Sequence, residues 1–271
     1  MIFVRDKGRM SNNILQYGHL YAWGREHHRR TVSMRFAYKY RYFNICRSRY
    51  HNFFVYLLAK YGCKWGIIPR VTFDVEGEDT ARQEDEMCRH RLIVAEGWYA
   101  RFPDLFIKYK EEIKRLFGFL PEVQRNVDSL YQLDRDDVLK LGVHIRRGDY
   151  ATWQDGKYLY DDAQYISIIK QFIDLHPERP VEVYLCGNDP KMDRRVYEQA
   201  LAGERVYVPQ GNPSEDLYLL SRCSYLIGPP STFSLVASMY RDIPLYWIEN
   251  IQERLTEGAF QRFDTLFRHI R

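Results

Sequence analysis

The stretch VLKLGVHIRRGDY at residues 138–150 decides the fold of this chain of 271 residues. Apolar residues dominate 138–145, so we expect a buried strand that ends directly before two arginines, a glycine and an aspartate. Downstream, short apolar runs alternate with segments of helical periodicity, which predicts β-α-β units and a doubly wound parallel sheet. The expected strands are 138–145, 181–186, 206–208, 225–227 and 245–248, and the expected helices are 161–176, 191–201, 215–222, 232–240 and 251–270.

The N-terminal half contains one well-marked unit of the same kind. A short strand at 2–4 leads through the loop KGRMSNN at 7–13 into a helix that extends to about Arg25, and Ser11 or Asn12 is expected to cap this helix. We therefore expect an α/β protein of two facing lobes, residues 1–134 and 135–271. Further strands are expected at 31–36 and 92–95, and a further helix at 104–117.

The composition indicates a globular protein that works in a reducing compartment. Hydrophobic residues make up 45% and charged residues 28%, which excludes a disordered or collagen-like chain. No apolar run approaches the roughly 18 residues of a membrane span, and residues 1–10 lack the apolar part of a secretory signal. The five cysteines are scattered without a C-x-x-C pair, so we expect free thiols, no zinc site and a cytoplasmic protein.

Charge and aromatic content leave several ligand classes open. The 40 basic and 36 acidic residues give a net charge of +4, which allows an anionic ligand without requiring nucleic acid. A nucleic-acid-binding module built on Arg25–Arg30 and Arg35–Arg49 remains an alternative, and its binding should weaken steeply with salt. The 22 tyrosines suit stacking on sugars, but tyrosine also fills cores and dimer interfaces.

Ligands of such sheets bind beyond the carboxyl ends of the strands, so the loops after 145, 186 and 227 are the places to search. Arg146 and Arg147 follow the first of these strands, and a guanidinium matches phosphate oxygens with two hydrogen bonds. Side chains alternate at a strand end, so the two arginines should point to different sides. The alternative is a surface arginine and an ion pair with Asp149.

Two further loops have features of an anion site. In IGPPSTFS at 227–234 a strand ends and a helix begins, so free N–H groups and hydroxyls would meet a phosphate there, although an ordinary helix cap is the alternative. The loop GRMSNN at 8–13 fits neither a dinucleotide fingerprint nor a Walker loop, and simple capping is its default interpretation. Asp134-Arg135-Asp136 has the D-x-D spacing of some metal sites but precedes a strand, so we expect no metal.

Taken in chain order, these three motifs resemble the α-1,2-fucosyltransferase family. That family has a G-R-x-G-N-Q-x-x-Q-Y loop, an H-x-R-R-x-D-Y strand end and an S-S-F-S helix start, which correspond here to 8–17, 144–150 and 231–234. The resemblance implies a GT-B fold with Rossmann-like lobes, GDP-fucose as donor, inversion at the anomeric carbon, and neither cofactor nor metal. Departures are Ser11 for glycine, Asn13 for glutamine, Pro229-Pro230 before the helix start and Leu235-Val236 in place of a Trp pair.

The resemblance also implies roles for individual residues. Arg146 would contact the β-phosphate with His144 beside it, and Asp149 is the first candidate for the base, although it could instead orient one of the arginines. Asp216 would read guanine, because a carboxylate accepts two N–H bonds from the edge of that base. The remaining donor-site residues are Ser231, Thr232, Phe233 and Ser234 around the pyrophosphate and ribose, and Arg9, Asn12 and Asn13 from the acceptor-side lobe, where Arg9 and Asn12 would face the fucose.

We therefore expect a metal-independent fucosyltransferase that moves L-fucose from GDP-fucose to a hydroxyl of a glycan, with α-1,2 linkage. A lipid-linked or surface-polysaccharide precursor is the kind of acceptor expected, with the enzyme in the cytoplasm or peripheral at the inner membrane face. No nucleic-acid partner and no transmembrane segment are expected. The alternatives are a catalytically silent nucleotide- or glycan-binding protein of the same fold, which donor hydrolysis would distinguish, and a GT-B transferase that uses another nucleotide sugar.

Overall fold

The structure, a computed structural model, describes residues 1–35, 40–187, 189 and 192–270. The chain divides into two compact units, Met1–Leu120 and Pro121–Arg271. The boundary expected after Asp134 falls inside the second unit, because helix α6 (Pro121–Asp128) packs on helix α9 (Pro213–Leu220) of that unit. The Tyr218 hydroxyl joins the two helices with a hydrogen bond of 3.1 Å to Asp128.

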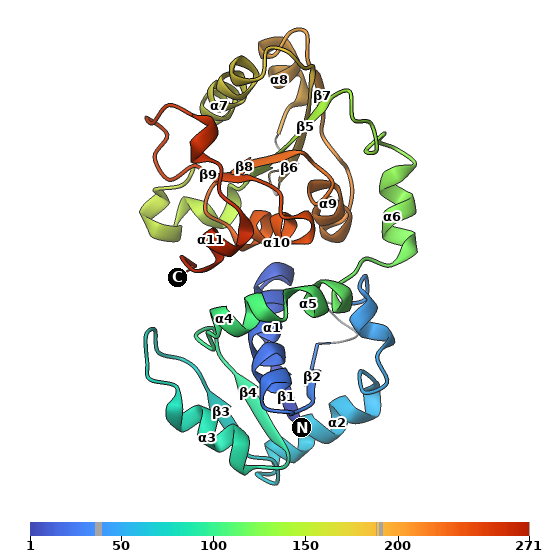
Figure 1. The fold of residues 1–271 in the computed structure, drawn as a ribbon, viewed down its shortest axis with the longest axis vertical. Coiled ribbons are helices and arrows are strands. Elements are labelled where there is room, and N and C mark those ends of the chain that lie inside the picture. The colour runs from blue at the N-terminus through green and yellow to red at the C-terminus, as the bar shows by residue number, and fades with distance from the viewer. Residues whose placement is uncertain (36–39, 188, 190–191, 271) are drawn as a thin grey trace. The chain divides into compact units, whose positions relative to one another are not determined.

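A parallel sheet forms the centre of the first unit (Figure 1). Its strands are short and mostly buried, as the apolar runs at 2–4 and 92–95 predict. Within the described residues the order across the sheet is β2-β1-β4-β3, so the loops after β1 and β4 are neighbours at the carboxyl edge. The strands are β1 (Ile2–Arg5), β2 (Thr31–Ser33), β3 (Arg70–Thr72) and β4 (Ile93–Glu96).

The helices of this unit depart from the sequence prediction in two respects. The helix expected at 104–117 is interrupted at Tyr109, which ends α4 (Pro103–Lys108) and begins α5 (Lys110–Leu116). Helices α2 (Phe53–Lys64) and α3 (Ala81–Arg89) were not expected. The long helix α1 (Met10–Glu26) packs beside α4 and α5 (Figure 1).

The second unit contains a parallel sheet in the order β7-β6-β5-β8-β9 within the described residues. Taken along the chain this is the order 3-2-1-4-5 of a doubly wound fold, as predicted. The direction of winding reverses between β5 and β8, and ligands of such folds bind at that switch point. The strands are β5 (Leu139–Ile145), β6 (Val181–Gly187), β7 (Arg205–Tyr207), β8 (Tyr225–Gly228) and β9 (Leu245–Trp247).

Helices cover both faces of this second sheet (Figure 1). The helix expected at 251–270 is wrong, because Gln261 pairs with Leu245 of β9 and keeps that segment extended. Only a short helix follows it. The helices are α7 (Asp162–Leu175), α8 (Arg194–Ala200), α9, α10 (Thr232–Arg241) and α11 (Phe263–Phe267), and 3-10 turns occur at Gly148–Ala151, Trp153–Gly156 and Glu257–Ala259. A further 3-10 turn, Asn44–Arg47, belongs to the first unit.

Candidate functional site

The chain turns sharply where β5 ends. Val143 and Ile145 are fully buried, so the strand is fixed in the core up to its last residue. Gly148 follows with φ +29°, a left-handed conformation that side chains disfavour, and it opens a short 3-10 turn. This turn brings Asp149 back toward the strand end.

Arg146 is held by that aspartate. Its Nε donates to Asp149 Oδ1 at 3.0 Å and its Nη2 donates to Oδ2 at 2.7 Å, so both carboxylate oxygens are engaged. The guanidinium also lies 5.3 Å from the centre of the Tyr150 ring. The Tyr150 hydroxyl in turn donates to the carbonyl of Pro230 in the loop after β8. The ends of β5 and β8 are thereby joined beside a fixed guanidinium.

Arg147 has different partners, as the alternation of side chains predicts. Its Nη1 donates to Asp189 Oδ2 at 2.7 Å, and its Nη2 donates to Asp162 Oδ1 at 2.5 Å. Its Nε donates to the Tyr160 carbonyl at 3.1 Å. Partial burial lowers the pKa of Arg147, but the hydrogen bonds to the two carboxylates outweigh burial and raise it. Arg147 therefore joins β5 to α7 and to the loop after β6.

His144, the penultimate residue of β5, is buried next to the switch point. Its ring lies 5.0 Å from the ring of Phe233, in the first turn of α10. Burial, together with the Arg146 charge, lowers the pKa of His144 to about 3, so the imidazole is neutral near pH 7. Its Nδ1 is buried and has no hydrogen-bond partner among the described residues.

The helix that follows β8 begins with an ordinary side-chain cap, one of the two interpretations of 227–234. Ser231 is the N-cap of α10, and its side chain accepts from the N–H of Phe233 at 3.2 Å. Ser234 is fully buried, donates to the Ser231 carbonyl at 3.1 Å and accepts from Trp247 Nε1 at 3.3 Å. Thr232 and Phe233 are half-buried at the start of the helix. Ser234 thus fixes the turn, while its neighbours border the end of β5.

Asp216 lies in the first turn of α9, near the carboxyl end of β6. Asn212 and Glu215 form a capping box at this helix start, so Glu215 is already engaged. Asp216 is turned inward, and its Oδ1 is buried without a hydrogen-bond partner in the described part of the chain. Burial, and then the Glu215 charge, raise the pKa of Asp216 to about 7. A buried acceptor of this kind fits a ligand that brings its own N–H donors.

The loop after β1 belongs to the first unit and is held by its own side chains. The prediction that Ser11 or Asn12 caps α1 is wrong: the helix begins at Met10, and its N-cap residue Arg9 makes no side-chain cap. Gln16 lies in the 8–17 motif but was not among the predicted site residues; its side chain accepts from Lys7 N–H at 3.1 Å and donates to the Lys7 carbonyl at 2.6 Å. The three predicted loop residues differ in exposure, with Arg9 exposed, Asn12 half-buried and Asn13 fully buried and bonded to the Gly8 carbonyl at 3.3 Å.

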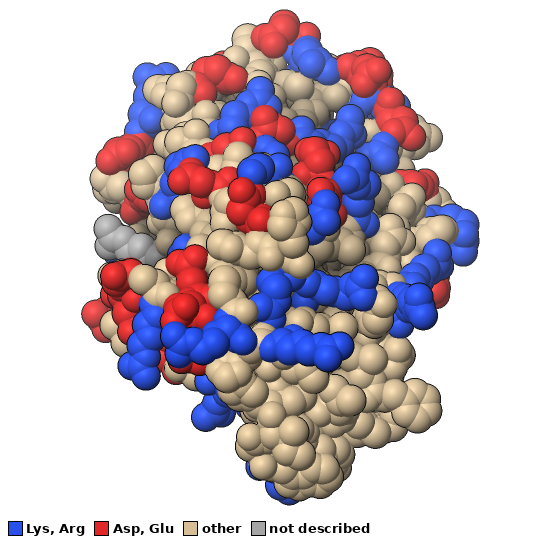
Figure 2. Space-filling model, turned by 60° about the horizontal axis from the view of Figure 1, so that its bottom comes forward, with Lys and Arg blue, Asp and Glu red and all other residues tan. Residues whose placement is uncertain are grey.

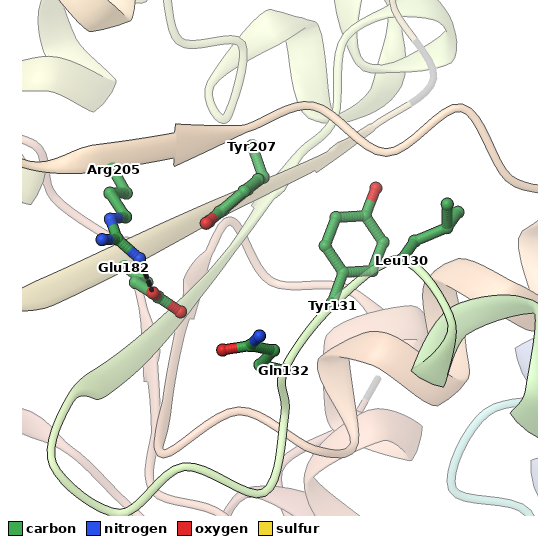
Figure 3. Close-up of a pocket in the computed structure, with 6 residues that line it drawn as sticks. All are labelled: Leu130, Tyr131, Gln132, Glu182, Arg205 and Tyr207. Carbon is green, nitrogen blue, oxygen red and sulfur yellow. Dashed lines mark hydrogen bonds and ion pairs between the residues drawn. The ribbon is translucent and has the colours of Figure 1, made fainter.

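A cavity of about 210 Å³ lies away from these residues, at the amino ends of β6 and β7 (Figure 3). Glu182 lines it and is paired with Arg205 at 3.4 Å and with Arg135 at 3.5 Å, so its buried charge is compensated. None of the predicted site residues lines this cavity. Its lining residues are Leu130, Tyr131, Gln132, Glu182, Arg205 and Tyr207.

Two residues of the D-x-D segment, Asp134 and Arg135, take part in ion pairs. Asp134 pairs with Arg222, and Arg135 pairs with Asp137. In the part of the chain that the structure describes, no group of three or more His, Cys, Asp or Glu residues is arranged to hold a metal ion. Over the same residues, no helix has the length and apolarity that crossing a membrane requires.

Several solved structures share this fold. A variant of FUT1 from Arabidopsis thaliana in complex with GDP is 12% identical, with a TM-score of 0.65, over 96% of this chain and 73% of that one. The fucosyltransferase NodZ from Bradyrhizobium is 16% identical, with a TM-score of 0.56, over 93% and 96%. POFUT1 in complex with GDP-fucose is 11% identical, with a TM-score of 0.55, over 93% and 95%. These likenesses confirm the predicted α/β, GT-B-like class with Rossmann-like lobes.

Sequence comparison identifies the family. No curated protein is similar enough to this chain to count as a match. The model of the family described as glycosyl transferase family 11, however, matches residues 107–242, which is half of the chain. The matched segment contains the turn after β5, the first turn of α9 and the start of α10, the three places where polar groups meet the switch point. With this family match over a fold shared by glycosyltransferases, the chain belongs to glycosyl transferase family 11 and is a glycosyltransferase.

Proposed function

We propose that this glycosyltransferase moves L-fucose from GDP-fucose to a hydroxyl of a glycan acceptor, with inversion and α-1,2 linkage. GDP occupies the FUT1 structure, and GDP-fucose was soaked into NodZ, which is described as an α-1,6-fucosyltransferase. These neighbours support the donor. The α-1,2 linkage rests on the three sequence motifs alone.

The observation that carries the proposal is the carboxylate of Asp216, whose Oδ1 is buried without a hydrogen-bond partner in the described part of the chain. Guanine presents two adjacent N–H donors, at N1 and N2, to a single carboxylate. Adenine and uracil do not offer this pair, so a site built on Asp216 would select GDP over ADP and UDP. The unpartnered Oδ1 and the pKa of about 7 both indicate that the ionised carboxylate is poorly solvated, and the N–H donors of guanine would compensate for this.

Arg146 and the start of α10 supply the charge that the leaving diphosphate needs. In the reaction, an acceptor hydroxyl oxygen bonds to the anomeric carbon as the bond from that carbon to the phosphate oxygen breaks. The bonding electrons leave with GDP, and the hydroxyl proton passes to a base. A fixed guanidinium and the N–H groups of a helix start stabilise the developing negative charge without having to reorganise. Neutral His144 beside them can donate one ring N–H.

Asp149 is better suited to holding Arg146 than to taking the acceptor proton. Both of its oxygens accept hydrogen bonds from that guanidinium, at 3.0 and 2.7 Å. A carboxylate paired in this way is a weak base, because protonation would break the pair. We therefore assign Asp149 the role of a positioning residue, while Arg9 and Asn12 remain candidates for contact with the sugar.

A thermal-unfolding panel tests the donor. GDP and GDP-fucose should raise the Tm, whereas UDP, ADP and CMP should not. In Asp216→Asn most of the Tm increase caused by GDP should be lost, because the amide replaces one acceptor oxygen with a donor. The matched control is Asp174→Asn, an exposed acid on α7, which should respond to GDP as the wild type does. An equal shift with UDP would overturn the donor assignment.

The same variant has an opposite effect on the protein without nucleotide. The pKa of Asp216 is raised in the folded state, so the group stabilises the fold below pH 4, and this stabilisation is lost as pH rises through about 7. At pH 8 the buried charge costs on the order of 4 kcal/mol. Asp216→Asn without nucleotide should therefore have a higher Tm than the wild type at pH 8, and this excess should vanish near pH 4.

Turnover separates an enzyme from a silent binding protein. Incubation with GDP-fucose should release GDP, and a fucosylated product should form with a glycan acceptor. EDTA should leave the rate unchanged. A protein that GDP-fucose stabilises, but that neither hydrolyses nor transfers the sugar across a panel of glycans, would be a binding protein of the same fold.

A further inference from the structure

Helix α2 and the turn after it present an apolar surface to solvent. Phe54 is 82% exposed, Trp65 68% and Ile67 72%. Among the exposed large hydrophobic residues that the structure describes, nearly half lie in this one short segment, whereas the others are scattered over both units. Single exposed apolar residues are normal, but a contiguous group marks an interaction site. We call Phe53, Phe54, Leu58, Tyr61, Trp65 and Ile67 the α2 surface.

The fold itself does not require the α2 surface. The opposite side of α2 already packs on the sheet, with Ala59 buried against a cluster that contains Phe3 and Val94. Gly62 makes that contact close, since a Cβ there would lie 2.6 Å from Ile68 Cδ1. Helix α2 is therefore apolar on both sides, although one side would suffice to anchor it.

Positive charge surrounds this surface, and the sequence around it lacks negative charge. Residues 27–73 contain ten Lys or Arg and no Asp or Glu, which leaves 30 basic against 36 acidic residues in the rest of the chain. The excess of positive charge thus comes entirely from the segment that includes α2.

The cations flank the apolar residues. Lys60 and Lys64 lie on α2 itself and are exposed. Arg30 and Arg49 lie over the Tyr50 ring, at 4.2 and 5.7 Å from its centre, and Tyr50 packs on the same cluster as α2. Figure 2, which brings the lower end of Figure 1 forward, shows uncharged side chains projecting beside a band of Lys and Arg.

We propose that the α2 surface docks this glycosyltransferase on a lipid bilayer that carries anionic headgroups. Projecting Phe, Trp, Leu and Ile side chains enter the boundary between headgroups and acyl chains, while flanking Lys and Arg pair with the headgroup phosphates. Single-stranded nucleic acid also binds basic and aromatic residues, but it uses ring faces along a groove. Leu58 and Ile67 offer no stacking face, and their exposure favours the lipid. The inference does not depend on the identity of the donor.

Vesicle sedimentation tests this docking. The full chain should sediment with vesicles of phosphatidylcholine and phosphatidylglycerol at about 0.1 M salt, and bind less to pure phosphatidylcholine. Raising the salt severalfold should weaken only the part of the binding that depends on the anionic lipid. Trp65 fluorescence should shift to the blue when vesicles are added.

Paired variants separate the two contributions. Phe54→Ser/Trp65→Ser should lower partitioning on the order of a hundredfold on both vesicle types. Lys60→Glu/Lys64→Glu should lower it on the order of thirtyfold or more, and only on the anionic vesicles. The matched control, Val75→Ser/Leu130→Ser, replaces two exposed apolar residues elsewhere and should partition as the wild type does. All variants replace exposed side chains, so their Tm should match that of the wild type.

Three results would overturn the proposal. The first is a wild type that binds neither vesicle type. The second is a dimer, detected by light scattering, that Phe54→Ser/Trp65→Ser converts to a monomer without affecting sedimentation, since the surface would then bind a second copy. The third is tight binding of single-stranded RNA that both paired variants abolish, while vesicle binding is unaffected by either.

Discussion

Arg146 and Arg147 are neighbours in the chain but belong to different regions of the second unit. Arg147 bonds to two carboxylates and a carbonyl and connects β5, α7 and the loop after β6. Arg146 bonds to the one carboxylate of Asp149, three residues further on, and lies beside the loop after β8. Because side chains alternate at a strand end, one of two adjacent arginines is built into the scaffold, and the other lies at the switch point, where we propose that it binds the ligand.

The number and source of the acidic partners distinguish the two roles. The partners of Arg147 come from distant parts of the chain, so breaking them loosens the packing of several elements. The partner of Arg146 is local and fixes only the orientation of the guanidinium. Variants of Arg146 should therefore lower turnover, whereas variants of Arg147 should lower stability.

The largest expected effect is that of Arg146→Lys. Lysine keeps the charge but loses the planar fork that holds a phosphate in one orientation. Turnover with GDP-fucose should fall on the order of a hundredfold or more, as when one preorganised donor is removed, and the melting curve should stay close to that of the wild type. Normal turnover in this variant would show that Arg146 does not contact the donor.

Arg147→Lys should affect stability instead. A single ammonium cannot span Asp162, Asp189 and the Tyr160 carbonyl together, so at least one half-buried carboxylate loses its bond to the cation. We expect a loss of about 2 kcal/mol in the free energy of unfolding, measured with denaturant, and turnover within a few fold of the wild type. If this variant is fully folded and inactive while Arg146→Lys is active, the two roles are reversed.

Asp149→Asn should have an intermediate effect on turnover. The amide retains one acceptor for the Arg146 guanidinium but loses the charge, so Arg146 is held less firmly in place. We expect about a tenfold loss of kcat, with the pH dependence of kcat unchanged. Loss of an ionisation from the pH profile would instead identify Asp149 as the base.

The titration of His144 should have a small effect on the free energy of unfolding, and only at acidic pH. Its folded pKa of about 3 lies below the ordinary value of 6.5, so its neutral form stabilises the fold above pH 6.5, and this is lost as pH falls toward 3. At pH 5.5 the cost is on the order of 1 kcal/mol. His144→Gln should flatten the fall in stability from pH 7 to 5.5 and weaken GDP binding.

The first unit provides a matched control for that variant. Burial lowers the pKa of His51 to about 4, so His51→Gln should flatten the same part of the stability curve. It should do so without changing the affinity for GDP. A loss of GDP affinity in both variants would mean that the effect of His144 comes from general destabilisation.

The sequence predicts the second sheet well because its strands are short apolar runs bounded by turns. Strands at 181–186 and 225–227 are each extended by one residue in the structure. The place of Arg146 at the switch point follows from the same pattern. The partners of Arg147 do not follow from it, since Asp162 and Asp189 are distant in sequence and no local signal distinguishes them from other acids.

The sequence does not predict elements whose bounds or buried sides are set by tertiary contacts. Helix α2 is apolar on both sides, so it shows no clear helical period, and it was not expected. The segment after 250 has enough apolar residues for a helix, but the pairing of Gln261 with Leu245 prevents one. Asp216 was named only through the family resemblance, while the burial of its Oδ1 without a described partner emerges from the packing of α9.

With the proposed guanine contact, the raised pKa of Asp216 would couple nucleotide binding to the release of a proton. With a pKa of about 7, the carboxyl is roughly half protonated at pH 7, while the proposed contact with guanine needs it ionised. Each GDP bound at that pH should therefore release about half a proton to the buffer. The heat of binding measured by calorimetry should depend on the ionisation enthalpy of the buffer, with a slope that disappears in Asp216→Asn and at pH 9.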